Sequence, residues 1–328
     1  MHGLERAPRD AIVAGAMIIT KRSWFRSLMT VQGTALERIW FRLLLTVACA
    51  VAVTVLYETG RIGATLSTLP FSLIGLALGI FLGFRNNTSY DRFWEGRKLW
   101  GRMINVSRSF TRQVQTMVGP LPGEPAQDEE RKRVHAELVH RTAGYVHVFR
   151  HHLRDETDLS DVEGLLPASE IEALGAESNR PTAVSARTGE RLRELWHGGW
   201  IHPMHLPVLE ASLTEMTGIQ GGCERIKATP IPTSYTILIH RIVATYAFAL
   251  PFGIVDTVHG WTPVVVLLIA YAFYGLDAIG DEIEDPFGKD DNDLPLSTLS
   301  RMIEVNVRQR LGETDLPELL KPRGGLLR

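Results

Sequence analysis

Apolar residues dominate one long stretch of the chain, from Ile62 to Phe84, which contains no charged side chain and stops against Arg85. At about 1.5 Å of rise per helical residue, a helix of this length crosses roughly 30 Å of hydrocarbon. Shorter apolar runs lie at 40–59, 237–255 and 259–278. The pattern therefore predicts four membrane helices, the second of them over 62–84.

Small residues follow one ridge of the predicted second helix. Gly75, Gly79 and Gly83 recur every fourth residue, and residues four apart lie one above the other on a helix. A ridge without side chains allows a neighbouring helix to approach closely. We therefore predict tight helix packing along it.

Bulky apolar residues occupy the adjoining stripe of the same helix. Leu76, Ile80 and Phe84 share the four-residue spacing, so they lie on one side of the helix. Such a stripe is compatible with protein core, lipid contact or the wall of a pore. Spacing alone favours core packing, because that is the commonest role of an apolar stripe at helical period.

Basic residues are in excess directly after the predicted second helix. They outnumber the acidic residues of that stretch, Asp91 and Glu95, and are Arg92, Arg97, Lys98, Arg102, Arg108 and Arg112. Such an excess marks the cytoplasmic side of a membrane. We expect residues 85–236 and 279–328 to form a helical cytosolic region. The protein is then a multi-pass protein of the cell's inner (plasma) membrane with both termini in the cytoplasm.

Within the expected cytosolic region, 131–154 has the composition of a polar helix. Ser160 with Glu163, and Ser169 with Glu172, have capping-box spacing and predict further short helices. Residues 175–190 are expected to be a loop. Helical periodicity returns over 191–229.

Composition supports a chain with both a membrane part and an aqueous part. The mean hydropathy of +0.01 is low for a protein made only of membrane helices, whereas 45% hydrophobic residues is high for a purely soluble one. A formal net charge of −2 gives no basic field for nucleic acid. The short apolar stretch 11–19 does not resemble a signal peptide, and 20–42 mixes aromatic and basic residues as at a membrane surface.

Two clusters could bind a metal ion. His140, His147 and His151 lie close to one helical stripe, and a membrane-bound metalloprotein that uses them is the rival interpretation from another class. The acidic run 281–293 surrounds a turn made by Pro286 and Gly288. Its oxygen-rich side chains suit a hard cation such as calcium, although a solvated acidic loop is the commoner outcome.

Patterns typical of enzymes are absent from the sequence. No Ser-His-Asp, Cys-His or phosphate-loop arrangement can be assembled, and the two cysteines form no CxxC motif. The predicted spans also contain no buried acid–base pair to serve as a proton relay. We therefore expect neither an enzyme nor a proton-coupled transporter.

Five motifs together resemble the bestrophin family in its bacterial branch. They are FLGFRNN at 81–87, RFWEGRKLWG at 92–101, GCERI at 222–226, TPIP at 229–232 and EDPFGKDDNDLPL at 284–296. The resemblance extends from about Arg22 to Leu296 and keeps the family's motif order. It implies an all-α membrane protein, a homopentameric channel with four membrane helices and a large helical cytosolic domain per subunit. The whole chain, 1–328, is then a single channel unit.

The resemblance also implies roles for particular residues. Leu76, Ile80 and Phe84 become the hydrophobic neck of the pore, and Met204 becomes the cytosolic aperture. Asp290 and Asp293 become the counterpart of the family's calcium clasp, which would hold calcium or another divalent cation as the only cofactor. Lys289 beside them, and Asp285 in place of a common asparagine, are departures from the clasp pattern.

The permeant ion follows from the resemblance only in part. Chloride and other anions are the family default, and a monovalent-cation-selective channel of the bacterial branch is the alternative. The expected partners are further copies of the chain, the lipid bilayer and small permeant ions, with no nucleic acid.

Overall fold

The computed structural model describes residues 33–63, 66–120 and 128–321. The predictions for 11–19 and for most of 20–42 therefore lie outside the described residues. The described chain is built from helices and divides into two compact units. We call residues 33–95 and 229–286 the apolar unit, and residues 96–228 and 287–321 the polar unit.

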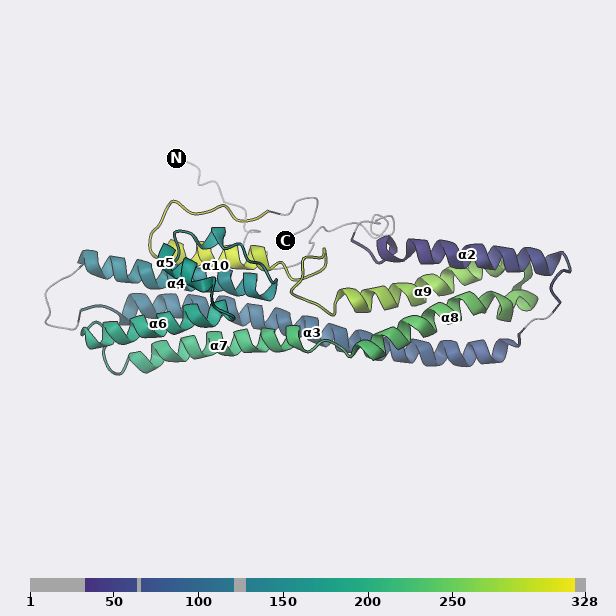
Figure 1. The fold of residues 1–328 in the computed structure, drawn as a ribbon, viewed down its shortest axis with the longest axis horizontal. Helices are drawn as coiled ribbons and strands as arrows, with labels where there is room; N and C mark the ends of the chain where they lie inside the picture. The colour runs from purple at the N-terminus through teal and green to yellow at the C-terminus, as the bar shows by residue number, and fades with distance from the viewer. Residues whose placement is uncertain (1–32, 64–65, 121–127, 322–328) are drawn as a thin grey trace, which may run out of the picture. The chain divides into compact units, whose positions relative to one another are not determined.

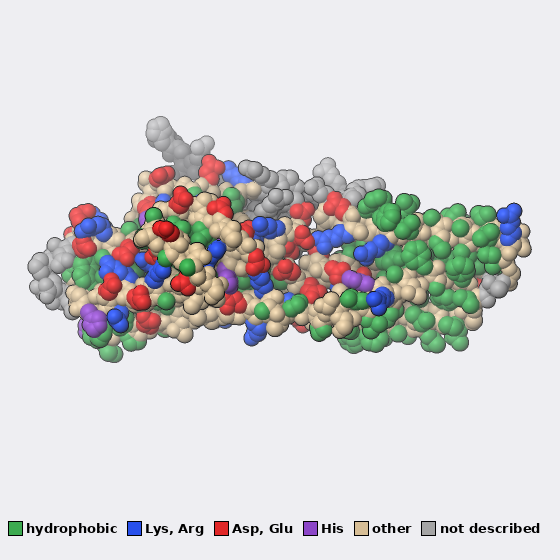
Figure 2. Space-filling view, viewed as in Figure 1, with side chains coloured by type: hydrophobic (Ala, Val, Ile, Leu, Met, Phe, Trp, Pro, Cys, Tyr) green, Lys and Arg blue, Asp and Glu red, His purple; other side chains and the backbone are tan. Residues whose placement is uncertain are grey.

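The apolar unit contains three segments that are long and apolar enough to cross a membrane. The first is α2 (Leu36–Glu58) and the second is part of α3 (Thr68–Met117). The third comprises α8 (Thr233–Val258), the short η3 (His259–Trp261) and α9 (Thr262–Glu282). Figure 2 shows hydrophobic side chains gathered over the visible face of these helices, with charged side chains near their ends.

Helices α2, α3, α8 and α9 run in roughly the same direction in the apolar unit (Figure 1). Buried side chains from all four form its core. Ile39 and Leu43 come from α2, Leu82 from α3, Val243 from α8 and Tyr274 from α9. The Tyr274 hydroxyl, 3.2 Å from Thr46 Oγ1 of α2, shares a hydrogen bond with it. This core fixes which faces of the four helices point inward.

The second predicted span differs from α3 at both ends. The helix begins at Thr68 rather than at Ile62, and it continues to Met117 instead of stopping at Phe84. No proline or turn-forming pair follows Phe84, and Arg85, Ser89 and Phe93 continue the buried face of the helix past the membrane segment. A change in polarity therefore does not end this helix.

The polar unit is assembled around α4 (Asp128–Leu153), which matches the polar helix predicted over 131–154. Trp100 of α3 stacks on Phe149 of α4 with ring centroids 5.5 Å apart, and both side chains are fully buried. The other elements are η2 (Ser160–Val162), α5 (Ala168–Leu174), α6 (Arg180–His197), α7 (Leu206–Ala228) and α10 (Leu296–Arg310).

The loop predicted over 175–190 is wrong, because α6 begins at Arg180. The Asn179 side chain caps the helix by accepting a hydrogen bond from the Thr182 amide, 3.2 Å away. Pro181 lies in the first turn, where proline is well tolerated. Val184 and Leu192 then bury one face of the helix. The helical stretch predicted over 191–229 is interrupted after His197 by a turn in which Gly199 has a φ of +77°.

The two predicted capping boxes do not form helix caps. Ser160 is the first residue of the 3-10 helix η2 and bonds to Asp158. Ser169 lies inside α5, whose N-cap is Pro167. Short helices occur at both places, but they begin without the predicted serine caps.

Candidate functional site

The membrane segment of α3 has two different faces. Leu78 and Leu82 are buried in the core of the apolar unit, whereas Leu76, Ile80 and Phe84 are 67%, 51% and 62% exposed. The exposed stripe therefore does not belong to the core of its own chain. Lipid contact and a pore wall remain as its possible roles.

The glycine ridge of α3 is packed at only one of its three positions within the chain. A Cβ atom on Gly75 would lie 2.6 Å from the Tyr246 hydroxyl of α8. On Gly79 or Gly83, a Cβ atom would meet no heavy atom within 4 Å. Close helix approach at these last two glycines can therefore come only from a helix outside the described chain.

A buried ion cluster joins α3 to α9 immediately after the exposed stripe. Arg85 is 1% exposed and donates through Nη1 to Asp277 Oδ1 at 2.8 Å. Its Nη2 donates to Asp281 Oδ1. Asp277 and Asp281 lie one helical turn apart on α9, so they present both carboxylates to the same arginine.

Two further helices complete this cluster. His240 of α8 places Nε2 3.1 Å from Asp281 Oδ2 and 3.4 Å from Asp277 Oδ1. Arg42 of α2 lies 3.9 Å from Asp277 Oδ2 with its own side chain largely exposed. We name Arg85, His240, Asp277 and Asp281 the ion cluster of the apolar unit.

The ion cluster places one buried charged residue inside a predicted span. Asp277 falls within the span predicted over 259–278 and is 1% exposed. Its partner Arg85 directly follows the apolar run, and sequence reasoning placed it outside the membrane helix. The two residues are 192 positions apart, so no local pattern connects them.

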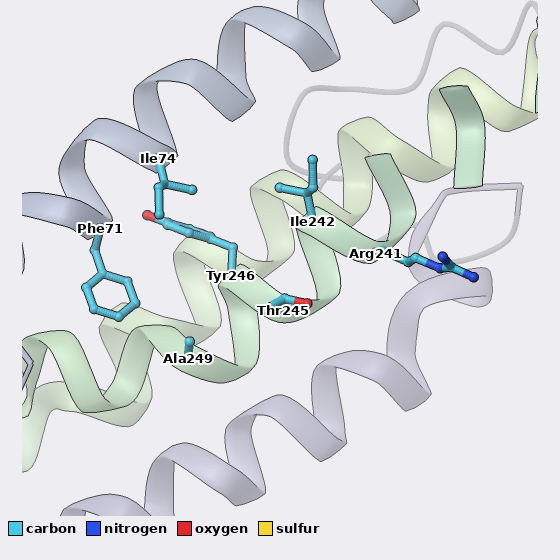
Figure 3. A pocket seen from close by; sticks show the side chains of 7 residues that line it. All are labelled: Phe71, Ile74, Arg241, Ile242, Thr245, Tyr246 and Ala249. Atoms are coloured by element: carbon cyan, nitrogen blue, oxygen red, sulfur yellow. The ribbon is translucent and has the colours of Figure 1, made fainter. Parts of the chain in front are cut away.

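A pocket of about 360 Å³ opens on the apolar unit between α3 and α8 (Figure 3). Phe71 and Ile74 of α3 lie beside Tyr246 of α8, and the Arg241 side chain extends away from them. The remaining lining is mostly apolar. This pocket offers contact to apolar groups and brings no acid–base pair together.

The acidic turn predicted to bind a cation lies between α9 and α10, within the polar unit. Asp293 Oδ2 accepts a hydrogen bond from the Asp290 amide at 2.7 Å, and the Asp293 amide donates to the Asp290 carbonyl at 3.1 Å. Asp293 is 7% exposed. Lys289 forms an ion pair with Glu156 at 2.6 Å, so its ammonium group is directed to a carboxylate outside the turn.

The predicted aperture residue is well exposed. Met204 lies in the turn before α7, and its amide donates to His202 Nδ1 at 3.2 Å. Its exposed fraction is 73% in the single chain. The structure therefore leaves the Met204 side chain available to another subunit or to solvent.

The histidine stripe of α4 forms an ion-pair network in place of the metal site of the rival interpretation. His140 contacts Glu313, whereas His147 contacts Glu304 at 2.9 Å and His151 contacts Asp161 at 2.7 Å. Arg150 Nη2 lies 2.7 Å from His151 Nε2. A guanidinium at that distance occupies the position that a cation bound to His151 would need.

Carboxylates around this network are held in their charged form. Burial alone would raise the pKa of Asp161, but hydrogen bonds from His147 and His151 and the charge of Arg150 lower this pKa well below its usual range. Burial alone would also raise the pKa of Glu304. His147, Arg301 and Arg308 outweigh this effect and lower that pKa. The network is therefore a set of ionised carboxylates that neutralise cations.

The geometry defines a helical membrane protein with an exposed apolar stripe on its longest helix. The chain matches the family model described as a bacterial and fungal bestrophin protein over residues 17–309, and it belongs to the bestrophin family. The predicted resemblance is confirmed.

Relatives and solved structures agree with this family. The chain is 41% identical over 305 residues to a voltage-dependent anion channel-forming protein of Ralstonia nicotianae, covering 93% of this chain and 97% of the relative. An Escherichia coli protein of the same description is 33% identical, with 92% and 96% covered. The crystal structure of a bacterial bestrophin homologue from Klebsiella pneumoniae matches with a TM-score of 0.77 and 34% identity, covering 84% of this chain and 99% of that one. The two relatives are described as anion channel-forming proteins, and the expectation that the chain is not an enzyme is confirmed.

Proposed function

We propose that the chain is one subunit of a homopentameric channel that passes small anions such as chloride across the cell's inner membrane. In this proposal α2, α3, α8 and α9 are the four membrane helices of each subunit, and both termini are cytoplasmic. The curated relatives named above are described as anion channel-forming proteins, which supports the anion as permeant ion. The basic excess after Phe84 supports the cytoplasmic side.

The observation that carries the proposal is the exposed stripe of α3. Leu76, Ile80 and Phe84 face away from the core of their own chain, and they offer no hydrogen bond to water or to an ion. If five copies surround a passage, this apolar ring opposes ions that must shed hydration water. Closure of the pore at this neck then requires no charged gate.

Purified protein in liposomes tests the proposal directly. Ion flux should occur without any added substrate, and the reversal potential in a chloride gradient should move toward the equilibrium potential of chloride. A reversal potential that follows the cation instead would establish the alternative, monovalent-cation selectivity. Absence of flux from a well-folded oligomer would contradict the channel.

The neck assignment is tested by paired substitutions on α3. Replacing Ile80 and Phe84 by Ala should widen and wet the constriction, so single-channel conductance or open probability should rise. Phe81→Ala is the matched control, because Phe81 is 52% exposed on the same helix but lies about 100° around it from Ile80 and about 60° from Phe84. An equal effect of the control would contradict the neck assignment.

The glycine ridge supports a contact between subunits. A Cβ atom on Gly79 would meet no heavy atom of the described chain within 4 Å beyond its own helix's backbone, so Gly79→Leu should leave the single chain folded. If a neighbouring helix packs there, the substitution should dissociate the pentamer. Native mass spectrometry measures this, and an intact pentamer would contradict the packing role.

A further inference from the structure

Three atoms that can bind a metal ion converge in the ion cluster of the apolar unit. They are Nε2 of His240 and one carboxylate oxygen each of Asp277 and Asp281, and all lie within 4.8 Å of one another. The imidazole nitrogen lies 3.4 Å from Asp277 Oδ1 and 3.1 Å from Asp281 Oδ2. One nitrogen and two oxygens are therefore close enough together to bind a single ion.

The spacing of these atoms matches a small transition-metal ion. A tetrahedral zinc ion binds nitrogen and oxygen at about 2.0–2.1 Å, which places its ligand atoms about 3.3–3.4 Å apart. The two observed separations agree with this value to within a few tenths of an ångström. Calcium takes six to eight oxygen ligands at longer distances, and the set of His240, Asp277 and Asp281 does not provide them.

We propose that His240, Asp277 and Asp281 form a binding site for Zn²⁺ or a similar divalent transition-metal ion. The site is distinct from the acidic turn at Asp290 and Asp293, which lies in the polar unit. It does not depend on the proposed conduction of ions.

Arg85 prepares the two carboxylates for this role. Its guanidinium bonds to Asp277 Oδ1 and Asp281 Oδ1, so it fixes their orientation from the buried side, as partners of metal ligands commonly do. Asp281 Oδ2 remains directed to His240. Asp277 presents to His240 the same Oδ1 atom that accepts from Arg85, and a carboxylate oxygen has a second lone pair for a metal ion.

The site is also accessible. Asp277 is buried, but the side chains of His240 and Asp281 are 35% and 34% exposed. In the single chain an ion can reach them without opening the helix bundle, and water can occupy its fourth position. The arrangement of three protein ligands and one open position is common for zinc outside purely structural sites.

Calorimetric titration of the full-length, tag-free protein with zinc chloride tests the proposal. The wild type should bind one zinc ion per chain at this site, and His240→Ala should weaken that binding at least tenfold while it leaves the Arg85 pairs intact. His259→Ala is the matched control, because His259 is an exposed histidine at the other end of α8. The zinc affinity of the His259→Ala variant should equal that of the wild type.

Anomalous diffraction at the zinc absorption edge independently locates the bound zinc ion. A peak between His240 and the two aspartates in the wild type, absent in His240→Ala, supports the site. Unchanged zinc affinity of His240→Ala, or zinc found only elsewhere, overturns it. Asp281→Asn gives a second test that removes charge without removing side-chain volume, and it too should weaken binding.

Discussion

Each unit of the molecule contains a buried arginine, and the two arginines are held in different ways. Arg85 of the apolar unit is bonded to two aspartates of a single helix, and the cluster ends at His240. Arg150 of the polar unit bonds to Asp161 and to Ser300. In both, Nε is buried without a hydrogen-bond partner among the described residues.

The difference is in what surrounds each pair. Asp161 also contacts His147 and His151. Glu156 contacts His151 and, at the surface, Lys289. Around Arg85, the further cationic partners of Asp277 are more distant: His240 lies 3.4 Å and Arg42 lies 3.9 Å from its carboxylate. A charge lost from the polar unit therefore has close replacements, whereas loss of Arg85 leaves Asp277 with only the more distant Arg42 and His240.

The largest effect is expected from Arg85→Met. Removing the guanidinium leaves Asp277 buried without its main cation, and breaking a buried pair typically costs about 3–5 kcal/mol. The free energy of unfolding in detergent should fall by this amount. Arg42→Met, at the exposed edge of the same cluster, should change it by less than about 1 kcal/mol. Equal losses for the two variants would show that burial does not distinguish them.

The two faces of α3 should respond differently to truncation. Leu82 is fully buried, so Leu82→Ala should destabilise the protein by about 3 kcal/mol. Ile80 is exposed, so Ile80→Ala should change the free energy of unfolding by about 0.5 kcal/mol or less unless other subunits cover it. Comparing the dissociated and assembled forms by thermal melts separates these cases.

Acid should weaken the polar unit through Asp161. Its lowered pKa stabilises the fold above the ordinary aspartate pKa of about 3.9, and this stabilisation is lost as pH falls through the folded-state value. Asp161→Asn should cost about 2 kcal/mol at pH 7. It should also lose less additional stability between pH 5 and pH 3 than the wild type does. Thermal melts across this range measure the difference, and parallel curves would contradict the role of Asp161.

The smallest effect on stability is expected from Lys289→Ala. The Lys289 side chain is largely exposed, so its pair with Glu156 should contribute less than about 1 kcal/mol. The same change removes a positive charge beside Asp290 and should strengthen any calcium binding by Asp290 and Asp293. Calorimetry with calcium chloride measures this. If neither wild type nor variant binds calcium, the acidic turn is only a solvated loop.

Local sequence patterns predicted where the helices lie better than they predicted which residues contact one another across helices. The polar helix α4 agrees with its prediction to within a few residues because its periodicity is continuous. The loop predicted over 175–190 failed because Asn179 and Pro181 begin a helix there, although both residue types are also common in turns. The family motifs pointed to the exposed stripe of α3, whereas the ion cluster was missed.

The reason for that failure is physical. Arg85 directly follows an apolar run, so its charge was assigned to the water phase. Its burial depends on Asp277 and Asp281, which are brought to it only by the packing of α9. A long-range ion pair leaves no periodic signal in either segment, and a single sequence contains no other record of it.

The separation of Arg85 from its partners has a consequence for how the protein is made. The arginine is synthesised 192 residues before Asp277. At a synthesis rate of about 5–20 residues per second, this is a delay of about 10–40 s. During this time α3 has left the ribosome while the carboxylates that will neutralise Arg85 do not yet exist. The buried pair therefore forms only after α9 has been synthesised, and a chain interrupted before α9 leaves an unpaired cation exposed to cellular quality control.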